Sequence, residues 1–469
     1  MQNSIQPNSI IKALLEAREE RWNSKLSLAK HGWHVVSLQL NLPGYPKNDD
    51  NTEQFIKLID KQFVRFLKAH APGKYREEKK CFIDKAGDCI YYLIPAKGIT
   101  SLELKNITEL FEESHSLGRI IDLDVLDTKG KQISSGKEKK CFICDKPAHV
   151  CRKEQTHSID QLRKEMLDAI ILFLEKERMK NCIERFSTWA VKALLYEVSL
   201  SPKPGLVCRV SAGAHTDMDF INFINSTAAL SPFFIELGWL AANNFNLEMA
   251  DCLPKIREVG LRMEEAMYES TGKINTHKGA VFLMALSMFS AVHVVHKKKK
   301  FKPGIFAGTV QQITRGIIQR ELCSVEESSR ITHGESCFLH FGLKGSGARG
   351  EAEQGLPTVM HHALPFIKEM DLSMEDMNDK NMFSILAPVL LKIMSVNNDT
   401  NVLFRHGEEV LEELKRKSIK VLNQVTNGDR DEYYKLVDWC NTKKISPGGS
   451  ADLLSVTMFV QFCQTDKGL

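Results

Sequence analysis

The sequence predicts a multidomain protein in which an N-terminal α+β domain precedes a larger all-α domain. The chain has 469 residues, which is too long for a single hydrophobic core. Residues 1–175 mix stretches of helical and strand periodicity, whereas residues 176–469 show one helical pattern after another. We place the boundary at 175, and the change itself lies in helix-like sequence between 157 and 185.

Short elements alternate in the N-terminal domain. Apolar residues at helical spacing predict helices over residues 10–22 and 55–70. Alternating apolar residues predict a strand over 33–44 that ends at Pro-Gly, a hairpin over 81–95 and a short strand over 119–127. Helices and strands that alternate in this way are typical of an α+β domain.

Bulk properties exclude several classes of function. The net charge is only +4, so no general affinity for nucleic acid or membranes is expected. The apolar stretch 279–295 contains His293 and predicts a buried core helix rather than a membrane span. No signal peptide is visible, and the 12 cysteines are scattered, so we expect reduced thiols in a cytoplasmic protein.

Polar clusters that combine glycine with charge interrupt the C-terminal helices. Glycine lets backbone N–H groups approach phosphates, and lysine or arginine supplies positive charge. Taken singly, each cluster is equally consistent with an ordinary glycine-capped helix end. No βαβ pattern accompanies the glycines at 345, 347 and 350, and no Walker A motif occurs. The clusters are Ser201–Asp219, Asn275–Gly279, Gly345–Glu351, Asn398–Arg405 and Ser446–Asp452.

Carboxylates lie beside small residues in several of these clusters. Asp217, Asp219, Asp399 and Asp452 have this setting, which suits Mg²⁺ held against a polyphosphate. The sequence therefore predicts a phosphate-handling site with Mg²⁺ as its cofactor.

In their order and spacing, these clusters resemble the triphosphoribosyl-dephospho-coenzyme A synthase family over about residues 190–460. The residues that carry the resemblance are Glu197–Val207, Gly213–Asp219, Asn275–Ala280, Gly347–Ala352 and Ser446–Asp452. The resemblance implies that ATP and 3′-dephospho-coenzyme A give the 2′-(5″-triphosphoribosyl) derivative and free adenine.

That reaction is a glycosyl transfer, which needs a base, help for the leaving adenine and a fixed triphosphate. The resemblance implies Glu197 or Glu351 as the base, and Asp217, Asp219 and Asp399 as metal or ribose ligands. Expected substrate ligands are Lys203, Arg209, His215, Asn275, His277, Lys278, Arg349, Asn401, Arg405 and Ser450, with Lys203, Arg209, Lys278 and Arg349 on the triphosphate.

Two aspartates mark the N-terminal domain. On a strand, Asp122 and Asp124 point to the same face, and two adjacent carboxylates form a natural Mg²⁺ pair. They are equally consistent with two solvent-facing acids on an edge strand. Arg119 is placed to neutralise a leaving diphosphate.

A cysteine-rich segment follows. The spacing Cys141-x-x-Cys144, then Cys151 and His157, is typical of a zinc site. Only one C-x-x-C occurs and the segment is partly apolar, so zinc is the less favoured interpretation. We prefer buried thiols with a substrate-facing His157.

This domain resembles the holo-citrate lyase synthase family of phosphoribosyl-dephospho-coenzyme A transferases over about residues 10–175. The residues Leu15–Arg21, Gly118–Val125 and Cys141–His157 carry the resemblance, which adds Arg18 as a substrate ligand. It implies attack by a serine of the citrate lyase acyl carrier (gamma) subunit, with release of diphosphate. The family's arginine before the cysteine segment is replaced here by Ser135, and Lys137, Lys139 or Lys140 is the expected substitute.

Three alternatives stay open at this point. The first is a synthase whose N-terminal domain only binds the carrier. The second is a regulatory nucleotide-binding protein without turnover. The third is an all-α hydrolase of ADP-ribose type, which would cleave its substrate without a dephospho-coenzyme A acceptor.

Overall fold

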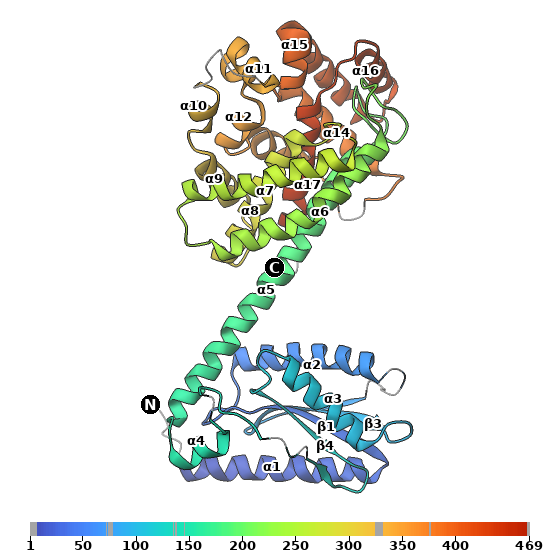
Figure 1. Cartoon of the computed structure of the whole chain (residues 1–469). Coiled ribbons are helices and arrows are strands. Elements are labelled where there is room, and N and C mark those ends of the chain that lie inside the picture. The colour runs from blue at the N-terminus through green and yellow to red at the C-terminus, as the bar shows by residue number, and fades with distance from the viewer. Residues whose placement is uncertain are drawn as a thin grey trace. The chain divides into compact units, whose positions relative to one another are not determined.

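The computed structural model describes residues 7–71, 73, 78–134, 136, 138–144, 146–323, 332–374 and 377–466. The chain divides into two compact units, Met1–Arg178 and Met179–Leu469 (Figure 1). The division falls within helix α5 (Ile159–Ser199). Met166 and Ile170 of this helix join the core of the first unit, whereas Cys182, Ile183 and Phe186 join that of the second.

The first unit is built on a five-stranded antiparallel sheet in the order β2-β3-β1-β4-β5. The expected strand, hairpin and short strand are all present, so the α+β prediction is confirmed. The strands are β1 (Trp33–Leu40), β2 (Lys79–Asp84), β3 (Gly87–Pro95), β4 (Ile121–Leu126) and β5 (Gln132–Ile133).

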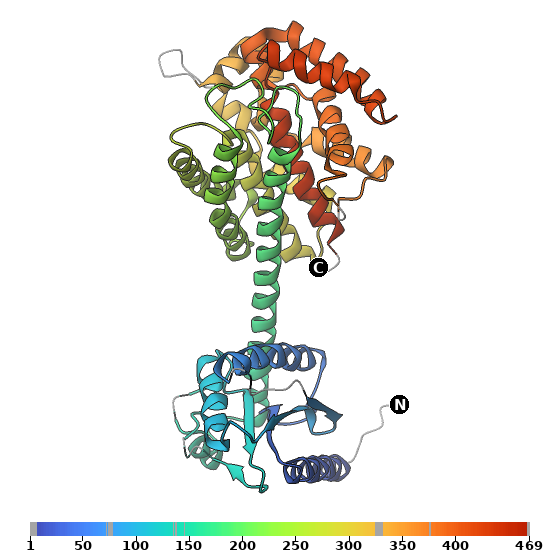
Figure 2. The same cartoon turned by 90° about the vertical axis from the view of Figure 1, so that its right-hand side faces the viewer.

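Helices cover both faces of this sheet, α1 on one side and α2 with α3 on the other (Figures 1 and 2). Val36 and Leu38 of β1 pack into the core that α2 and α3 complete, and Val35 faces the smaller cluster that includes Ala29 of α1. The alternation follows from the period of two along a strand. The helices are α1 (Pro7–Lys30), α2 (Asp50–His70), α3 (Ser101–Ser114) and α4 (Ala148–Glu154).

Helix α3 was not predicted from the sequence, although its start carries a capping box. The Thr100 hydroxyl accepts a hydrogen bond from the Glu103 N–H, and the Glu103 carboxylate accepts one from the Thr100 N–H. This pairing satisfies two backbone donors that the helix leaves free.

Every named element of the second unit, among the residues that the structure describes, is a helix, which confirms the all-α prediction. After α5 come α6 (Phe220–Asn243), α7 (Met249–Ser270), α8 (Lys278–Lys298), α9 (Pro303–Thr314), α10 (Ile317–Glu321), α11 (His333–Phe341), η1 (Gly342–Gly345), α12 (Gly347–Glu353), η2 (Thr358–Ala363), α13 (Leu364–Glu369), α14 (Met382–Val396), α15 (Thr400–Val425), α16 (Asp431–Thr442) and α17 (Gly448–Thr465).

Helix α8 lies at the centre of this unit. By length and composition alone it is apolar enough to cross a membrane, but 83% of its apolar window is buried inside the unit. It packs against α6, α7, α9 and α17. The stretch 279–295 therefore forms a core helix, as its sequence predicted. The first turns of α8 and α17 both reach the cavity described below.

Candidate active sites

A cavity of about 970 Å³ lies within the second unit, where segments far apart in the sequence come together. A cavity of this size encloses most of a nucleotide-sized ligand. Ten of the residues predicted for this domain line it: Glu197, Lys203, His215, Asp217, Asn275, His277, Lys278, Arg349, Asn401 and Arg405. The structure thus gathers most of the predicted residues around one space.

Glu197 and Lys203 form a buried ion pair at this cavity. Glu197 lies near the end of α5, and Lys203 follows in the next turn of chain. The Lys203 ammonium donates to the Glu197 carboxylate and also to the Glu197 carbonyl oxygen, at 2.9 Å. Only 3% of Glu197 and 2% of Lys203 are exposed. The lysine therefore stabilises a carboxylate that reaches the cavity.

Asp452, near the N-terminus of α17, supplies a second carboxyl group to the cavity. Burial, with the nearby charges of Glu197 and Asp399, raises its pKa well above the ordinary value. A hydrogen bond from the Ala280 N–H opposes the shift without cancelling it. These surroundings favour the protonated form of Asp452, which lies close to the ion-paired Glu197.

His277 lies at the start of α8, with its Nδ1 atom 2.7 Å from the Ser226 hydroxyl. Burial, helped by the charge of Lys203, lowers the pKa of His277 to about 3. The imidazole is therefore neutral. Its buried Nε2 atom has no hydrogen-bond partner among the described residues, which leaves a polar atom for a bound ligand.

Besides Lys203, two further predicted cations at the cavity have carboxylate partners that also line it. The Lys278 ammonium lies 3.1 Å from Glu264, and the Arg349 Nε donates to Glu321 at 2.9 Å. Arg405 completes the group, and no described carboxylate lies within ion-pair distance of it. These cations give the cavity the positive charge that a phosphate chain needs.

His215 joins two predicted segments. Its Nε2 atom lies 2.8 Å from the Ser446 hydroxyl, and its Nδ1 atom lies 3.8 Å from the Asp217 carboxylate. Burial lowers the pKa of His215, and the attraction of Asp217 opposes this. The Asp217 side chain itself is exposed at the cavity edge.

Asp399 and Ser450 do not line the cavity, although both were predicted site residues. The Asp399 carboxylate accepts from the Ser450 N–H at 2.8 Å, from the Ser450 hydroxyl at 2.9 Å and from the Asn401 N–H at 3.1 Å. Burial raises the pKa of Asp399. These bonds join the first turns of α15 and α17.

Three further predicted residues also lie outside the cavity lining. Arg209 is exposed and pairs with Asp379 at 2.7 Å, and Asp219 caps α6 by accepting from the Asn222 N–H at 3.0 Å. Glu351 accepts from the Thr358 hydroxyl, and burial raises its pKa. Each of the three thus has a partner within the protein.

Some lining residues escaped the selection made from the sequence. Asp452 was noted as a carboxylate beside small residues but was not chosen for a role, although it completes the Ser446–Asp452 cluster. Glu264 and Glu321 lie in helices outside every polar cluster, so spacing gave no signal for them.

In the first unit, Asp122 and Asp124 lie on the same face of β4, each half-buried. Across the ladder they face Gln39 and Ser37 of β1. Gln39 donates to Asp122 at 2.9 Å, and Gln132 donates to Asp124 at 3.0 Å. The predicted parallel orientation of the two carboxylates is present.

Two lysines accompany this pair. Lys139 donates to Asp122 at 3.2 Å, and although burial disfavours its charge, Asp122 and Glu112 together raise its pKa. Lys25 of α1 donates to Ser37 at 2.8 Å. Burial lowers the pKa of Lys25, against the attraction of Asp124. Of the three lysines proposed in place of the family arginine, Lys139 reaches Asp122, and Lys137 lies outside the described residues.

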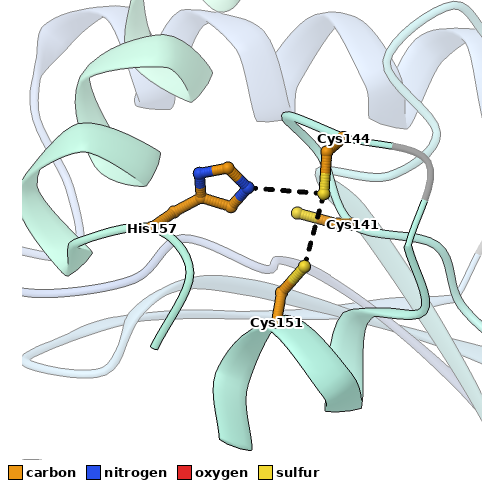
Figure 3. A group of neighbouring side chains, drawn as sticks. All are labelled: Cys141, Cys144, Cys151 and His157. Carbon is orange, nitrogen blue, oxygen red and sulfur yellow. Dashed lines mark hydrogen bonds between the residues drawn. The ribbon is translucent and has the colours of Figure 1, made fainter. Parts of the chain in front are cut away.

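The other predicted residues of this unit do not contact the aspartates. Arg119 is half-buried, and its Nε atom has no hydrogen-bond partner among the described residues. Burial lowers the pKa of Arg119, while the nearby Cys141 and Glu112 act in the opposite direction. Arg18 is exposed on α1. His157 points at the cysteines, with Nε2 3.4 Å from the Cys144 sulfur (Figure 3). This geometry weighs against both a substrate-facing His157 and the preference for thiols without metal.

Comparison with known families gives two matches, one for each unit. The model described as "CitG: ATP:dephospho-CoA triphosphoribosyl transferase" matches residues 183–468. The model described as "CitX: Apo-citrate lyase phosphoribosyl-dephospho-CoA transferase" matches residues 9–171.

Similar proteins cover either the whole chain or its second unit. "Protein CitXG" of Leuconostoc mesenteroides subsp. cremoris is 30% identical over 95% of this chain and 96% of its own length. "Protein CitXG" of Haemophilus influenzae is 29% identical over 96% and 95%. The 2-(5″-triphosphoribosyl)-3′-dephosphocoenzyme-A synthase of Klebsiella pneumoniae is 36% identical over 61% of this chain and 91% of its own length.

Proposed function

This chain belongs to the CitG family and carries a CitX domain before it, and from this premise we propose how its two units divide the work. The chain is a bifunctional transferase that combines a triphosphoribosyl-dephospho-CoA synthase with an apo-citrate lyase phosphoribosyl-dephospho-CoA transferase. ATP and 3′-dephospho-CoA are the substrates of the synthase. The residue roles below are our proposal.

The synthase reaction joins a ribose hydroxyl to an anomeric carbon. The 2′-hydroxyl of dephospho-CoA attacks the anomeric carbon of ATP, the bond to adenine breaks, and the hydroxyl proton must leave while adenine gains one. A base and an acid in different protonation states are therefore required near the same bond.

The single observation that carries the proposal is the arrangement of Glu197 and Asp452 in one cavity. Glu197 is ion-paired with Lys203 and acts as the base that takes the 2′-hydroxyl proton. Asp452 keeps its proton because burial raises its pKa, and it donates that proton to the leaving adenine. Two neighbouring carboxyl groups whose surroundings hold them in opposite states are a recurring acid–base arrangement.

The triphosphate is held by cations on the cavity wall. Lys278 and Arg349 exchange their carboxylate partners, Glu264 and Glu321, for phosphate oxygens, and Arg405 binds without such an exchange. The neutral His277 offers its Nε2 atom to a ribose or base group. Fixing the triphosphate aligns the anomeric carbon with the incoming hydroxyl.

Mg²⁺ fits this cavity through Asp217, whose exposed oxygen ligands suit a hard cation. When bound, it would neutralise part of the charge on the triphosphate. Asp219 and Asp399 cap helices with their carboxylates. We therefore propose that they stabilise the structure of the site and do not coordinate Mg²⁺ directly.

In the transferase, Asp122 and Asp124 form the catalytic centre. A serine hydroxyl of the carrier attacks the α-phosphorus of the intermediate, and diphosphate leaves. Two side-chain amides and one lysine donate hydrogen bonds to the aspartates, so carboxylate oxygens remain to coordinate Mg²⁺. When bound, the ion would neutralise part of the phosphate charge. Lys139 stabilises the leaving diphosphate.

The partner of this unit is the acyl carrier (gamma) subunit of citrate lyase, and we place both reactions in the cytoplasm, where ATP and dephospho-CoA are available. No nucleic-acid or membrane partner is required by either reaction.

Intact-mass measurement tests both halves of the proposal. The full chain is incubated with ATP, dephospho-CoA and apo-carrier, while adenine is measured by chromatography. We expect adenine release in step with a carrier that gains the phosphoribosyl-dephospho-CoA mass. Glu197→Gln should reduce adenine release by about 100-fold or more, the usual worth of a general base. Asp379→Asn, at an exposed pair, is the matched control.

Different results would favour the alternatives. Adenine release with an unmodified carrier indicates a synthase with a carrier-binding module. Cleavage of ATP without dephospho-CoA indicates a hydrolase. No adenine release under any condition indicates a nucleotide-binding regulator.

A further inference from the structure

Four metal-binding side chains converge in the first unit, and none of them belongs to the aspartate pair. One ligand atom from each of Cys141, Cys144, Cys151 and His157 lies within 4.8 Å of all the others (Figure 3). The Cys144 and Cys151 sulfurs are 3.3 Å apart, and the His157 Nε2 lies 3.4 Å from the Cys144 sulfur. A tetrahedral centre with zinc–sulfur bonds of about 2.3 Å places its sulfurs about 3.8 Å apart, so a small outward shift would accommodate an ion.

The backbone around the first two cysteines is that of a metal-binding loop. A bridge between Lys140 and Pro147 closes the loop, and the Cys141 N–H donates to the Lys146 carbonyl at 2.8 Å. The backbone N–H groups of Ile143 and Cys144 both approach the Cys141 sulfur. Such N–H groups stabilise a thiolate that binds a cation.

The remaining ligands come from other elements. Cys151 lies on α4, and His157 precedes α5, so four ligands tie together a loop, a short helix and the entry to a long one. Between 138 and 157, Cys151 is the only described residue that is fully buried. Apolar burial therefore contributes little to the stability of this segment, and a bound metal ion would supply the missing cross-link.

We propose that Cys141, Cys144, Cys151 and His157 bind one Zn²⁺ ion. Three thiolates and one imidazole in tetrahedral arrangement suit zinc better than calcium or magnesium, which bind oxygen ligands. Because all four positions are filled by protein, the ion holds structure and does no chemistry on the substrate.

The site lies next to residues of the aspartate pair. Lys139, which donates to Asp122, stands two residues before Cys141, and its carbonyl accepts from the Ala148 N–H at 2.8 Å. Arg119 lies near Cys141. Zinc thus fixes the segment that carries Lys139 toward Asp122, although the metal site itself does not depend on the transfer reaction.

Metal analysis of the full chain tests this proposal. The protein is purified under reducing conditions without chelators, and its metals are measured by mass spectrometry. We expect one zinc ion per chain, released when a mercurial reagent titrates the thiols. Cys144→Ser and His157→Ala should lose most of this zinc, while Cys81→Ser, at an exposed cysteine of strand β2, should keep it.

Cobalt provides a second readout that does not depend on whether the variants fold. Co²⁺ added to the metal-free wild-type chain should give the visible bands of tetrahedral coordination and a thiolate charge-transfer band. A reduced wild-type chain that binds neither zinc nor cobalt overturns the proposal. So does a metal-free chain whose mass shows a Cys144–Cys151 disulfide that resists reduction, or zinc that survives in both cluster variants.

Discussion

The Asp452 carboxylate lies directly against the backbone of Gly279, so that a Cβ atom at position 279 would stand 2.1 Å from the Asp452 Oδ2 atom. The contact joins the N-terminal parts of α17 and α8, and the Ala280 N–H donates to the same carboxylate. A neighbouring side chain thus explains this glycine, which lies in a cluster whose glycines were first attributed to phosphate binding.

Gly279→Ala should therefore displace Asp452. Overpacking of this kind costs about 1–3 kcal/mol of stability, and the shifted acid should lower adenine release. Chemical denaturation and the adenine assay measure the two effects. Gly308→Ala is the matched control, since its Cβ would meet open space on α9, outside the cavity lining, and should stabilise that helix by up to about 1 kcal/mol. Unchanged stability and activity in Gly279→Ala would contradict the arrangement.

The raised pKa of Asp452 predicts a pH-dependent stability. Between the ordinary pKa of aspartate and the raised value in the folded chain, the folded state binds more protons than the unfolded state. The contribution of protonated Asp452 to the free energy of unfolding is therefore fully present at low pH. It is lost as pH rises, by up to about 1.4 kcal/mol per pH unit.

Asp452→Asn removes that dependence. Relative to the wild type, the variant should gain stability between about pH 5 and about pH 8, while its adenine release falls by about 100-fold because the acid is missing. Denaturation curves at the two pH values test this. A stability difference that does not change with pH would show that Asp452 ionises normally.

His277 should stay neutral wherever the enzyme works. Burial lowers its pKa to about 3, so the stability that its neutral form contributes is complete above about pH 6.5 and declines below that value. The acid side of the pH–rate profile should then have the same shape in His277→Gln as in the wild type. The rate itself should fall by about tenfold or less, because the variant loses one neutral hydrogen bond. If an acid limb near pH 6 disappears in the variant, His277 is a titrating group.

The fold of each unit could be predicted because it depends on local patterns, whereas most of the cavity residues were expected from the family resemblance. The period of two in β4 placed Asp122 and Asp124 on one face, and the interrupted apolar helices placed Lys278 and Arg349 at helix starts. These relations need no knowledge of distant contacts.

What escaped prediction depends on contacts between distant segments. No local pattern distinguishes Asp452, which lines the cavity, from Asp399, which lies beneath it bonded to Ser450. The convergence of His157 with three cysteines likewise requires α4 and α5 to bring the ligands together. Helix α3 is different, because the Thr100 and Glu103 capping box was readable from the sequence and was overlooked.

The two activities should separate by mutation. Asp122→Asn and Asp124→Asn remove one negative charge each from the paired carboxylates of β4, and carrier loading from purified intermediate should fall by about 100-fold or more. Adenine release should not change, because the cavity that we propose for it is lined only by residues of the second unit. Intact mass of the carrier and chromatography of adenine give the two readouts.

Asp50→Asn serves as the control for this separation. Asp50 is an exposed acid in the first turn of α2 within the same unit, so its loss should leave carrier loading within about twofold of wild type. Loading that persists in both strand variants would leave the first unit as a carrier-binding module. Loading that falls equally in Asp50→Asn would indicate a general loss of fold, since that side chain lies on a different element from the paired aspartates.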